Sequence, residues 1–95
     1  MRFTWSPRKA RENLRKHGVS FEEATTVFAD PLAKIFDDPD HSIGEHREII
    51  FGHSTYPRLL LVSFTEIEEE VVRIISARRP DTPERRAYEE SFEQA

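Results

Sequence analysis

The sequence of 95 residues contains no cysteine, which excludes disulfide bonds and thiolate metal ligands. Its three glycines are isolated, so the chain has no glycine-rich loop of the kind that cradles phosphate groups. The longest apolar run, residues 59–62, is far too short to span a membrane, and the first residues contain no signal-peptide core. These absences predict a cytoplasmic protein whose fold depends on its hydrophobic core alone.

Length and histidine spacing narrow the remaining possibilities. A chain of this size, with 37% hydrophobic residues, suits one small domain that spans residues 1–95. None of the four histidines has a second histidine four residues away, the helical spacing typical of a zinc site. With cysteine also absent, we predict neither a bound metal ion nor a cofactor.

Charge is segregated along the chain, although the formal net charge is only −4. Residues 1–17 carry six basic side chains and one acidic one, and residues 71–86 carry five basic and two acidic ones. Residues 18–70 carry twelve acidic side chains and three basic ones. If the two basic segments meet in the fold, they form a face that suits phosphate groups, because local potential rather than net charge governs anion binding.

Periodicity and capping residues predict an α+β fold. Ser6 followed by Pro7 marks the start of a helix that ends at Gly18. Ser20 and Glu23 have the spacing of a capping box for a second helix. The predicted order is strand 2–5, helix 7–17, helix 21–29, strands 32–36, 47–51, 59–64 and 71–77, and a last helix capped by Thr82.

Short connections between the later strands favour an antiparallel meander of about four strands. The polar residues 37–44 are predicted to form a loop, and the acidic run 66–70 a turn. We expect the first two helices to cover one face of this sheet.

Two adjacent arginines follow the last predicted strand. The mostly apolar residues 71–77 run directly into Arg78 and Arg79. A buried strand is rigid and holds a charge at its end in a fixed position, and the planar fork of arginine suits phosphate. The strand end is therefore a candidate phosphate site. The alternative is that both arginines are ordinary surface charges that stop the strand.

Polar side chains also gather on the first predicted helix. Lys9, Asn13 and Lys16 share one helical stripe, and His17 lies at its border. His17 is either a proton-transfer residue or a helix-end histidine that bonds the last carbonyl groups.

This set of arginine, lysine, histidine and tyrosine side chains suits the cleavage of RNA by attack of its own 2′-hydroxyl group. The enzyme must remove a proton, stabilise the charged phosphorane and protonate the leaving 5′-oxygen, and none of these steps needs a metal ion. Two aromatic residues, Trp5 and Tyr88, either stack on a base or belong to the core.

Several segments occur in the order and spacing of a known family. They are WSPRK at 5–9, NLRKHGVSFEEA at 13–24, FADPL at 28–32, RIISAR at 73–78, and then Glu84, Arg85 and Tyr88. On these segments, which span nearly the whole chain, the sequence resembles the BrnT toxin family.

The resemblance implies a RelE-like fold and a metal-independent endoribonuclease toxin of a bacterial type II toxin–antitoxin system. It implies growth inhibition, and neutralisation by a BrnA-like antitoxin that has a ribbon-helix-helix DNA-binding domain. Operator DNA would be contacted only through this antitoxin, in a hetero-oligomer, and the basic face would dock an acidic antitoxin segment. We predict that the catalytic residues are Arg78, Arg79, His17, Lys9, Arg47 and Tyr88.

Two positions depart from the family's pattern. Arg79 stands where the family often has lysine, and residues 67–70 lack an arginine that often follows this turn. One alternative is therefore a catalytically weak or idle homologue that acts mainly as the antitoxin's partner in operon autorepression. Without the resemblance, a small nucleic-acid-binding module is a further alternative.

Overall fold

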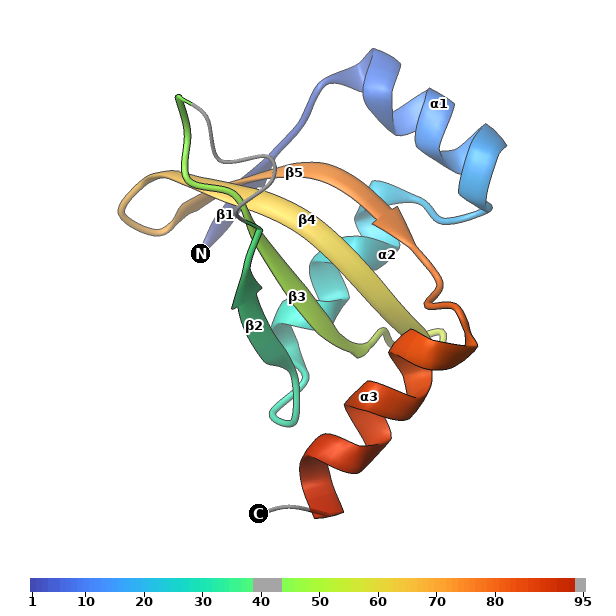
Figure 1. The fold of residues 1–95 in the computed structure, drawn as a ribbon. Helices are drawn as coiled ribbons and strands as arrows, with labels where there is room; N and C mark the ends of the chain where they lie inside the picture. The colour runs from blue at the N-terminus through green and yellow to red at the C-terminus, as the bar shows by residue number, and fades with distance from the viewer. Residues whose placement is uncertain (39–43, 94–95) are drawn as a thin grey trace.

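The computed structural model describes residues 1–38 and 44–93 and confirms the predicted α+β class. Figure 1 shows the arrangement of a curved sheet with helices around it. None of the described helices is long and apolar enough to cross a membrane. The elements are β1 (Arg2–Thr4), α1 (Pro7–His17), α2 (Phe21–Thr26), the 3-10 turn η1 (Val27–Ala29), β2 (Lys34–Asp37), β3 (Glu48–His53), β4 (Leu59–Glu68), β5 (Val71–Arg78) and α3 (Thr82–Glu93).

The sheet has five strands in the order β1-β5-β4-β3-β2. Strands β2 to β5 form the predicted antiparallel meander. Describing the sheet as a four-stranded meander is incomplete, because β1 joins it as a fifth strand, parallel to β5. The acidic run is not all turn, since β4 continues to Glu68, and only the next two residues turn the chain. Most of the predicted polar loop, residues 39–43, lies outside the described residues.

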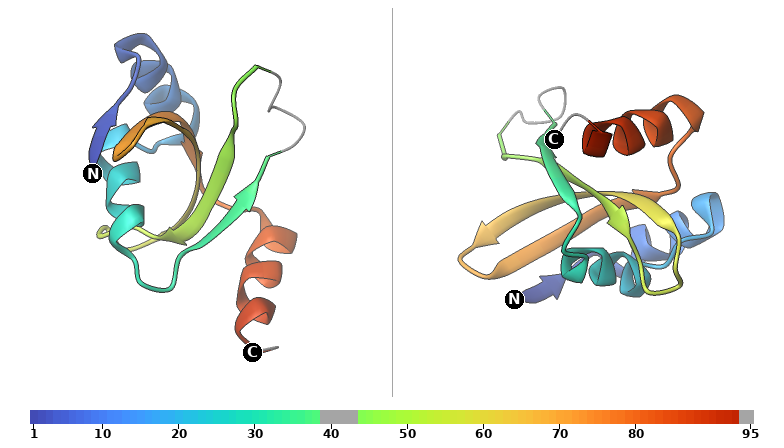
Figure 2. Two further views of the ribbon diagram at one scale, coloured as in Figure 1. Left: turned by 90° about the vertical axis from the view of Figure 1, so that its left-hand side faces the viewer. Right: turned by 90° about the horizontal axis from the view of Figure 1, so that it is seen from below.

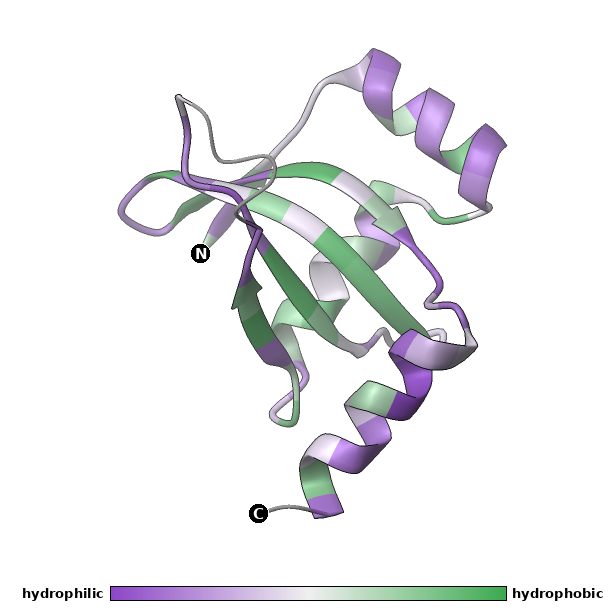
Figure 3. Ribbon diagram, viewed as in Figure 1, coloured by the Kyte–Doolittle hydropathy of each residue, from purple (hydrophilic) through white to green (hydrophobic). Residues whose placement is uncertain are grey.

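Helices α2 and α3 lie on opposite faces of the sheet, as the right-hand view of Figure 2 shows. On the α2 face, apolar side chains of α2 and of the three central strands form the main core. On the α3 face, a smaller cluster contains Phe51, Leu59 and Tyr88. Figure 3 shows the contrast between the hydrophobic central strands and the mostly hydrophilic α1. The sheet is therefore covered on both faces, although α3 covers only part of its face.

Helix α1 lies beside the free edge of β5, which differs from the prediction that both early helices cover one sheet face. Strand β1 pairs only with the first three residues of β5. Beyond that point the side-chain amide of Asn13 replaces a strand: its Nδ2 donates to the Ala77 carbonyl at 2.8 Å, and its Oδ1 accepts from the Ala77 N–H at 3.0 Å. Nδ2 also donates to the Val19 carbonyl at 2.9 Å. Asn13 is only 6% exposed, so these bonds fix α1 against the strand.

The predicted caps of α1 are confirmed. The Ser6 hydroxyl accepts a hydrogen bond from the Lys9 N–H, and Pro7 occupies the first turn. Gly18 ends the helix with φ of 68°, a left-handed conformation that glycine adopts without steric cost. These local signals set the length of α1, and thereby the position of His17 at its last turn.

The capping boxes differ from the prediction. Ser20 accepts from the Glu23 N–H as expected, but the Glu23 carboxylate binds the Arg58 guanidinium at 2.7 and 2.8 Å instead of returning to Ser20. At α3, reciprocal bonds join Asp81 and Glu84, so Asp81 rather than Thr82 supplies the cap.

We expect Asn13→Ala to lower the free energy of unfolding by roughly 2–4 kcal/mol, because it leaves the buried N–H and C=O groups of Ala77 without partners. Urea unfolding measures the change. Arg11→Ala on the solvent side of the same helix is the control and should leave stability nearly unchanged. Equal unfolding midpoints for the Asn13 variant and the wild type would contradict this role.

Candidate functional site

The face of the sheet on the side of α3, called the α3 face below, carries polar side chains from β5. The register pairs Thr65 with Arg73, Ser63 with Ser76, and Leu61 with Arg78. Because alternate residues of β4 share one face, Arg73, Ser76 and Arg78 also share that face. Strict alternation along β5 would separate Arg73 from the other two.

A β-bulge is responsible for this arrangement. The register of β4 and β5 shifts between Ser63 and Phe64, and Ile75 has no partner there. A bulge adds one residue to one strand and re-aims the side chains that follow. Here it brings Arg73 onto the face of Ser76 and Arg78, which periodicity alone did not reveal.

A polar pocket of about 230 Å³ lies where α1 meets β5. Its lining residues are Lys9, Glu12, Asn13, Lys16, His17 and Ser76. The structure therefore brings together two of the predicted site residues, Lys9 and His17, and adds Ser76 from the sheet. Within the described part of the chain, the ammonium groups of Lys9 and Lys16 form no ion pair.

Arg78 extends from the strand two residues after Ser76 and is held by a carboxylate. Its two terminal nitrogens each donate to one oxygen of Glu84 at 2.8 Å. Glu84 also accepts from the Asp81 N–H in the α3 cap. The Arg78 hydrogen bonds lower the pKa of Glu84 to about 2, and the same pair raises the pKa of Arg78. Both groups therefore stay charged at neutral pH, and Arg78 is fixed at the start of α3.

Arg79 follows the strand end and is exposed. Its carbonyl accepts a hydrogen bond from Arg78 at 3.3 Å. Its guanidinium makes no ion pair within the residues that the structure describes, so it is available to an anion.

Arg47 belongs to a different group at the other end of the α3 face. Its Nε donates to Glu45 at 2.8 Å, and Arg73 binds the second oxygen of the same carboxylate. The Arg47 hydrogen bond is the main cause of the lowered pKa of Glu45. Phe51 is in register with Leu61 and Arg78 across the sheet, and Arg47 precedes Phe51 by four residues. Four residues of a strand span roughly 13 Å. The two arginines thus do not meet at one point.

Tyr88 is a core aromatic residue rather than an exposed one. It is 7% exposed, and its ring stacks on Phe51 with 4.7 Å between centroids. Burial raises the pKa of its hydroxyl group, and the nearby Asp30 charge adds to the effect. Trp5 likewise packs edge-on against Phe21 in the main core. Both rings belong to the core, and Tyr88 also lines an apolar pocket between α3 and the sheet.

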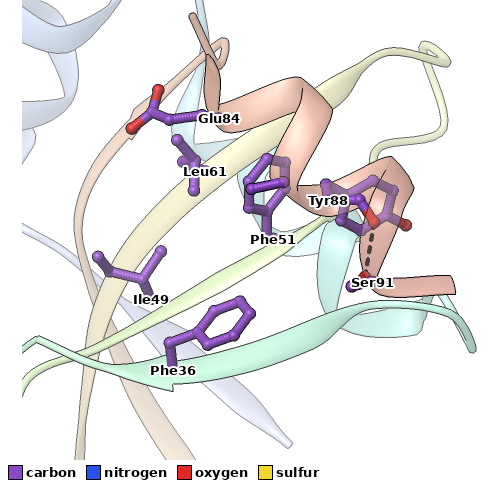
Figure 4. A pocket seen from close by; sticks show the side chains of 8 residues that line it. Phe36, Ile49, Phe51, Leu61, Glu84, Tyr88 and Ser91 are labelled. Atoms are coloured by element: carbon purple, nitrogen blue, oxygen red, sulfur yellow. Dashed lines mark hydrogen bonds between the residues drawn. The ribbon is translucent and has the colours of Figure 1, made fainter. Parts of the chain in front are cut away.

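An apolar pocket of about 380 Å³ lies between α3 and the sheet. Figure 4 shows its walls, with Phe36 and Ile49 from the sheet on one side and Tyr88 and Ser91 from α3 on the other. The lining residues are Phe36, Ile49, Phe51, Leu61, Glu84, Ala87, Tyr88 and Ser91. The sequence analysis did not identify this pocket, because its residues come from four separate elements.

Asp37, His46 and Glu48 form a group with the composition of a metal site that sequence spacing did not suggest. Their ligand atoms lie within 4.8 Å of one another. The β2–β3 pairing places Asp37 opposite Glu48, and His46 Nε2 lies 3.2 Å from Asp37 Oδ1. Asp37 and His46 are exposed, and ordinary ion pairing accounts for this geometry, so we assign the group no ligand.

Two of the residues that share the α3 face, Arg73 and Ser76, were absent from the sequence-based site. The available signal was an arginine inside an otherwise apolar strand, which is unusual unless the side chain faces a polar surface. The order of the elements did not reveal that Ser76 lies beside α1.

A small α+β domain on which arginines, lysines and a histidine gather at α1 and the end of β5 carries the groups that suit the phosphates of a nucleic acid. Residues 5–84 match the family described as "Ribonuclease toxin, BrnT, of type II toxin-antitoxin system". The chain therefore belongs to the BrnT family of ribonuclease toxins.

The fold is similar to a solved structure of the same family. This is the crystal structure of the Brucella abortus ribonuclease toxin BrnT, which matches with a TM-score of 0.68 and 23% sequence identity. The match covers 86% of this chain and 99% of the Brucella chain. No curated protein sequence matches the chain.

We expect Glu84→Gln to lower the free energy of unfolding by about 1–2 kcal/mol at neutral pH, because Arg78 loses its charged partner. The folded-state pKa of Glu84, about 2, lies below its ordinary value of 4.5, so its contribution is complete above pH 4.5 and is lost as the pH falls toward 2. The stability difference between the two proteins should shrink over this range. Urea unfolding at stepped pH measures it.

The control is Glu90→Gln, because Glu90 is exposed on the same helix and forms no ion pair within the described residues. It should show a small difference that does not vary with pH. A Glu84→Gln difference that stays constant down to pH 2 would contradict the linkage to Arg78.

Proposed function

We propose that the chain is an endoribonuclease toxin that cleaves RNA on the α3 face of its sheet, beside α1, without a metal ion. Membership of the BrnT family supports ribonuclease activity. The observation that supports this site is the polar pocket, where Lys9 and His17 of α1 meet Ser76 of β5, two residues before Arg78. Proton-transfer and charge-stabilising groups are thus present within one small region.

The reaction that suits these groups is attack of the RNA 2′-oxygen on the adjacent phosphorus. The P–O2′ bond forms as the P–O5′ bond breaks, which gives a 2′,3′-cyclic phosphate and a free 5′-hydroxyl group. One group takes the 2′ proton, another gives a proton to the leaving oxygen, and cations neutralise the phosphorane. His17 is the best single candidate for proton transfer, because imidazole accepts and donates protons near neutral pH.

The cations have separate proposed roles. Arg78 and Arg79 hold the scissile phosphate, and Lys9 lies on the α1 side of the same region. Arg47 and Arg73, at the far end of the α3 face, would bind a more distant phosphate. Tyr88 would act as a positioning residue, since its buried ring holds α3 on the sheet.

The partner is proposed from the family, because a type II toxin–antitoxin system implies an antitoxin. We propose a BrnA-like antitoxin with a ribbon-helix-helix domain that alone contacts operator DNA, in a hetero-oligomer in the cytoplasm. An acidic antitoxin segment would lie on the face formed by α1 and the end of β5, where it would pair with the cations and exclude RNA. The proposed relation to RelE-like toxins fits the element order, and residues 1–95 would act as one domain.

We expect Arg78→Ala to reduce RNA cleavage about 100- to 1,000-fold, by analogy with the loss of about 2.7–4 kcal/mol when one transition-state donor is removed. The assay is initial-rate cleavage of single-stranded RNA in the presence of EDTA, in which the wild type should keep its activity. His17→Gln should also lose most activity, because the amide cannot transfer a proton in place of the imidazole group.

Arg11→Ala is the matched control, because Arg11 lies on the opposite side of α1 from the polar pocket. It should cleave at the wild-type rate. A folded Arg78→Ala protein with wild-type activity would refute the phosphate role, and cleavage that EDTA abolishes and one divalent ion restores would refute the metal-free reaction.

The second functional prediction concerns the complex with the antitoxin. Co-expression with the product of the neighbouring gene should give a stable complex that no longer cleaves RNA, measured by co-purification and the same cleavage assay. A complex that cleaves as fast as the free chain would show that the antitoxin does not cover this face. If the free chain neither cleaves RNA nor slows growth while the pair still represses its promoter, the idle-partner alternative is correct.

A further inference from the structure

The apolar pocket beneath α3 has an exposed aromatic ring at its edge. Phe36 is 51% exposed although its side chain is large and apolar, and it lines the pocket together with Ile49 and Phe51. Figure 4 shows the ring on β2, on the far side of the pocket from α3. Exposed aromatic rings beside a hollow commonly mark binding surfaces, because leaving them in water is unfavourable.

The apolar pocket and Arg78 are close on the same face. The register places Phe51 and Leu61 in one row with Arg78, so Phe51 lies about 10 Å from Arg78, two strand spacings away. Glu84 lines the pocket and also binds the Arg78 guanidinium. A single strand of RNA with a phosphate at Arg78 can therefore place a neighbouring base in the pocket.

Two of the three polar side chains that line this pocket, Glu84 and Ser91, are already used within the protein. The Glu84 oxygens bind Arg78 and the Asp81 N–H, and the Ser91 hydroxyl donates to the Tyr88 carbonyl. Few groups remain to read the hydrogen-bonding edge of a ligand. The pocket therefore suits a flat apolar surface, which is what the face of any nucleobase offers.

A cation lies at the β2 side of this pocket as well. Lys34 is paired with Phe51 in the sheet, and its Nζ lies 4.5 Å from the centroid of the Phe92 ring. With Arg78 on the β5 side, cationic groups lie on two sides of the pocket, and Glu84 neutralises part of the Arg78 charge. This distribution matches a base whose flanking phosphates are negative, and the pocket is continuous with the proposed cleavage face.

We propose that this pocket binds one unpaired nucleobase of the RNA substrate by stacking on Phe36, while a phosphate of the same strand lies at Arg78. The inference rests on the proposed function for the phosphate position. Its consequences are a requirement for single-stranded RNA and little preference among bases at that position, because stacking does not depend on the hydrogen-bonding pattern.

The test compares Phe36→Ala with Ile35→Ala, a matched control. Ile35 is the adjacent residue on the opposite face of β2 and is 54% exposed, so both variants remove a similarly exposed apolar side chain. Fluorescence anisotropy would measure binding of a short single-stranded oligoribonucleotide whose 2′-hydroxyls are methylated, which prevents cleavage. A second set of oligonucleotides carries one abasic residue at each position in turn.

Phe36→Ala should weaken binding about five- to thirtyfold, the effect expected for loss of one stacked base, while Ile35→Ala binds as the wild type does. One abasic position should weaken wild-type binding to a similar extent and should have no further effect on Phe36→Ala, since the two changes remove the same contact. Thermal unfolding checks that both variants fold.

Wild-type affinity in Phe36→Ala, additive effects of the abasic residue, or no binding of the methylated RNA by any protein would overturn the inference. Unchanged RNA binding with lost capture of the neighbouring gene's product would assign the pocket to the antitoxin instead. A different outcome would refute the proposed function and leave the pocket proposal intact. In that outcome, the wild type binds the methylated RNA in a Phe36-dependent way but does not cleave unmodified RNA.

Discussion

The side-chain amide of Asn13 is the interaction on which the polar side of the fold depends. Strand β1 covers only the first part of the β5 edge, and Asn13 satisfies the exposed backbone groups of Ala77 beyond it. A buried amide without partners would be destabilising. Because Asn13 must keep all three hydrogen bonds, the position of α1 along β5 and its rotation about the helix axis are fixed. The rest of α1 is mostly hydrophilic and contributes little apolar packing.

This attachment determines which side chains meet. With Asn13 fixed, the residues four before and four after it on α1, Lys9 and His17, face Ser76 across the polar pocket. Glu84 has the corresponding role at α3, because one carboxylate both caps the helix and holds Arg78. Two short polar contacts therefore position groups from three elements on one face, where a flexible loop would leave them in many arrangements.

Sequence reasoning succeeded where the deciding interactions are local. Ser6 and Gly18 act through neighbouring backbone groups, so their spacing predicted the ends of α1. It failed where a residue far away in the sequence determines the contact. Glu23 follows the spacing of a capping box but binds Arg58, 35 residues further along the chain. The separation of Arg47 from Arg78 likewise depends on strand register, which periodicity does not define.

The parallel pairing of β1 with β5 has a consequence for the order of folding. Asn13 and Ala77 are 64 residues apart, and Arg2 pairs with Val71, so the N-terminal strand and helix acquire their partners only after nearly the whole chain has been synthesised. Contacts between distant segments form slowly, since the loop between them must first close. The pocket that contains His17 is therefore absent from the nascent chain until β5 has emerged from the ribosome.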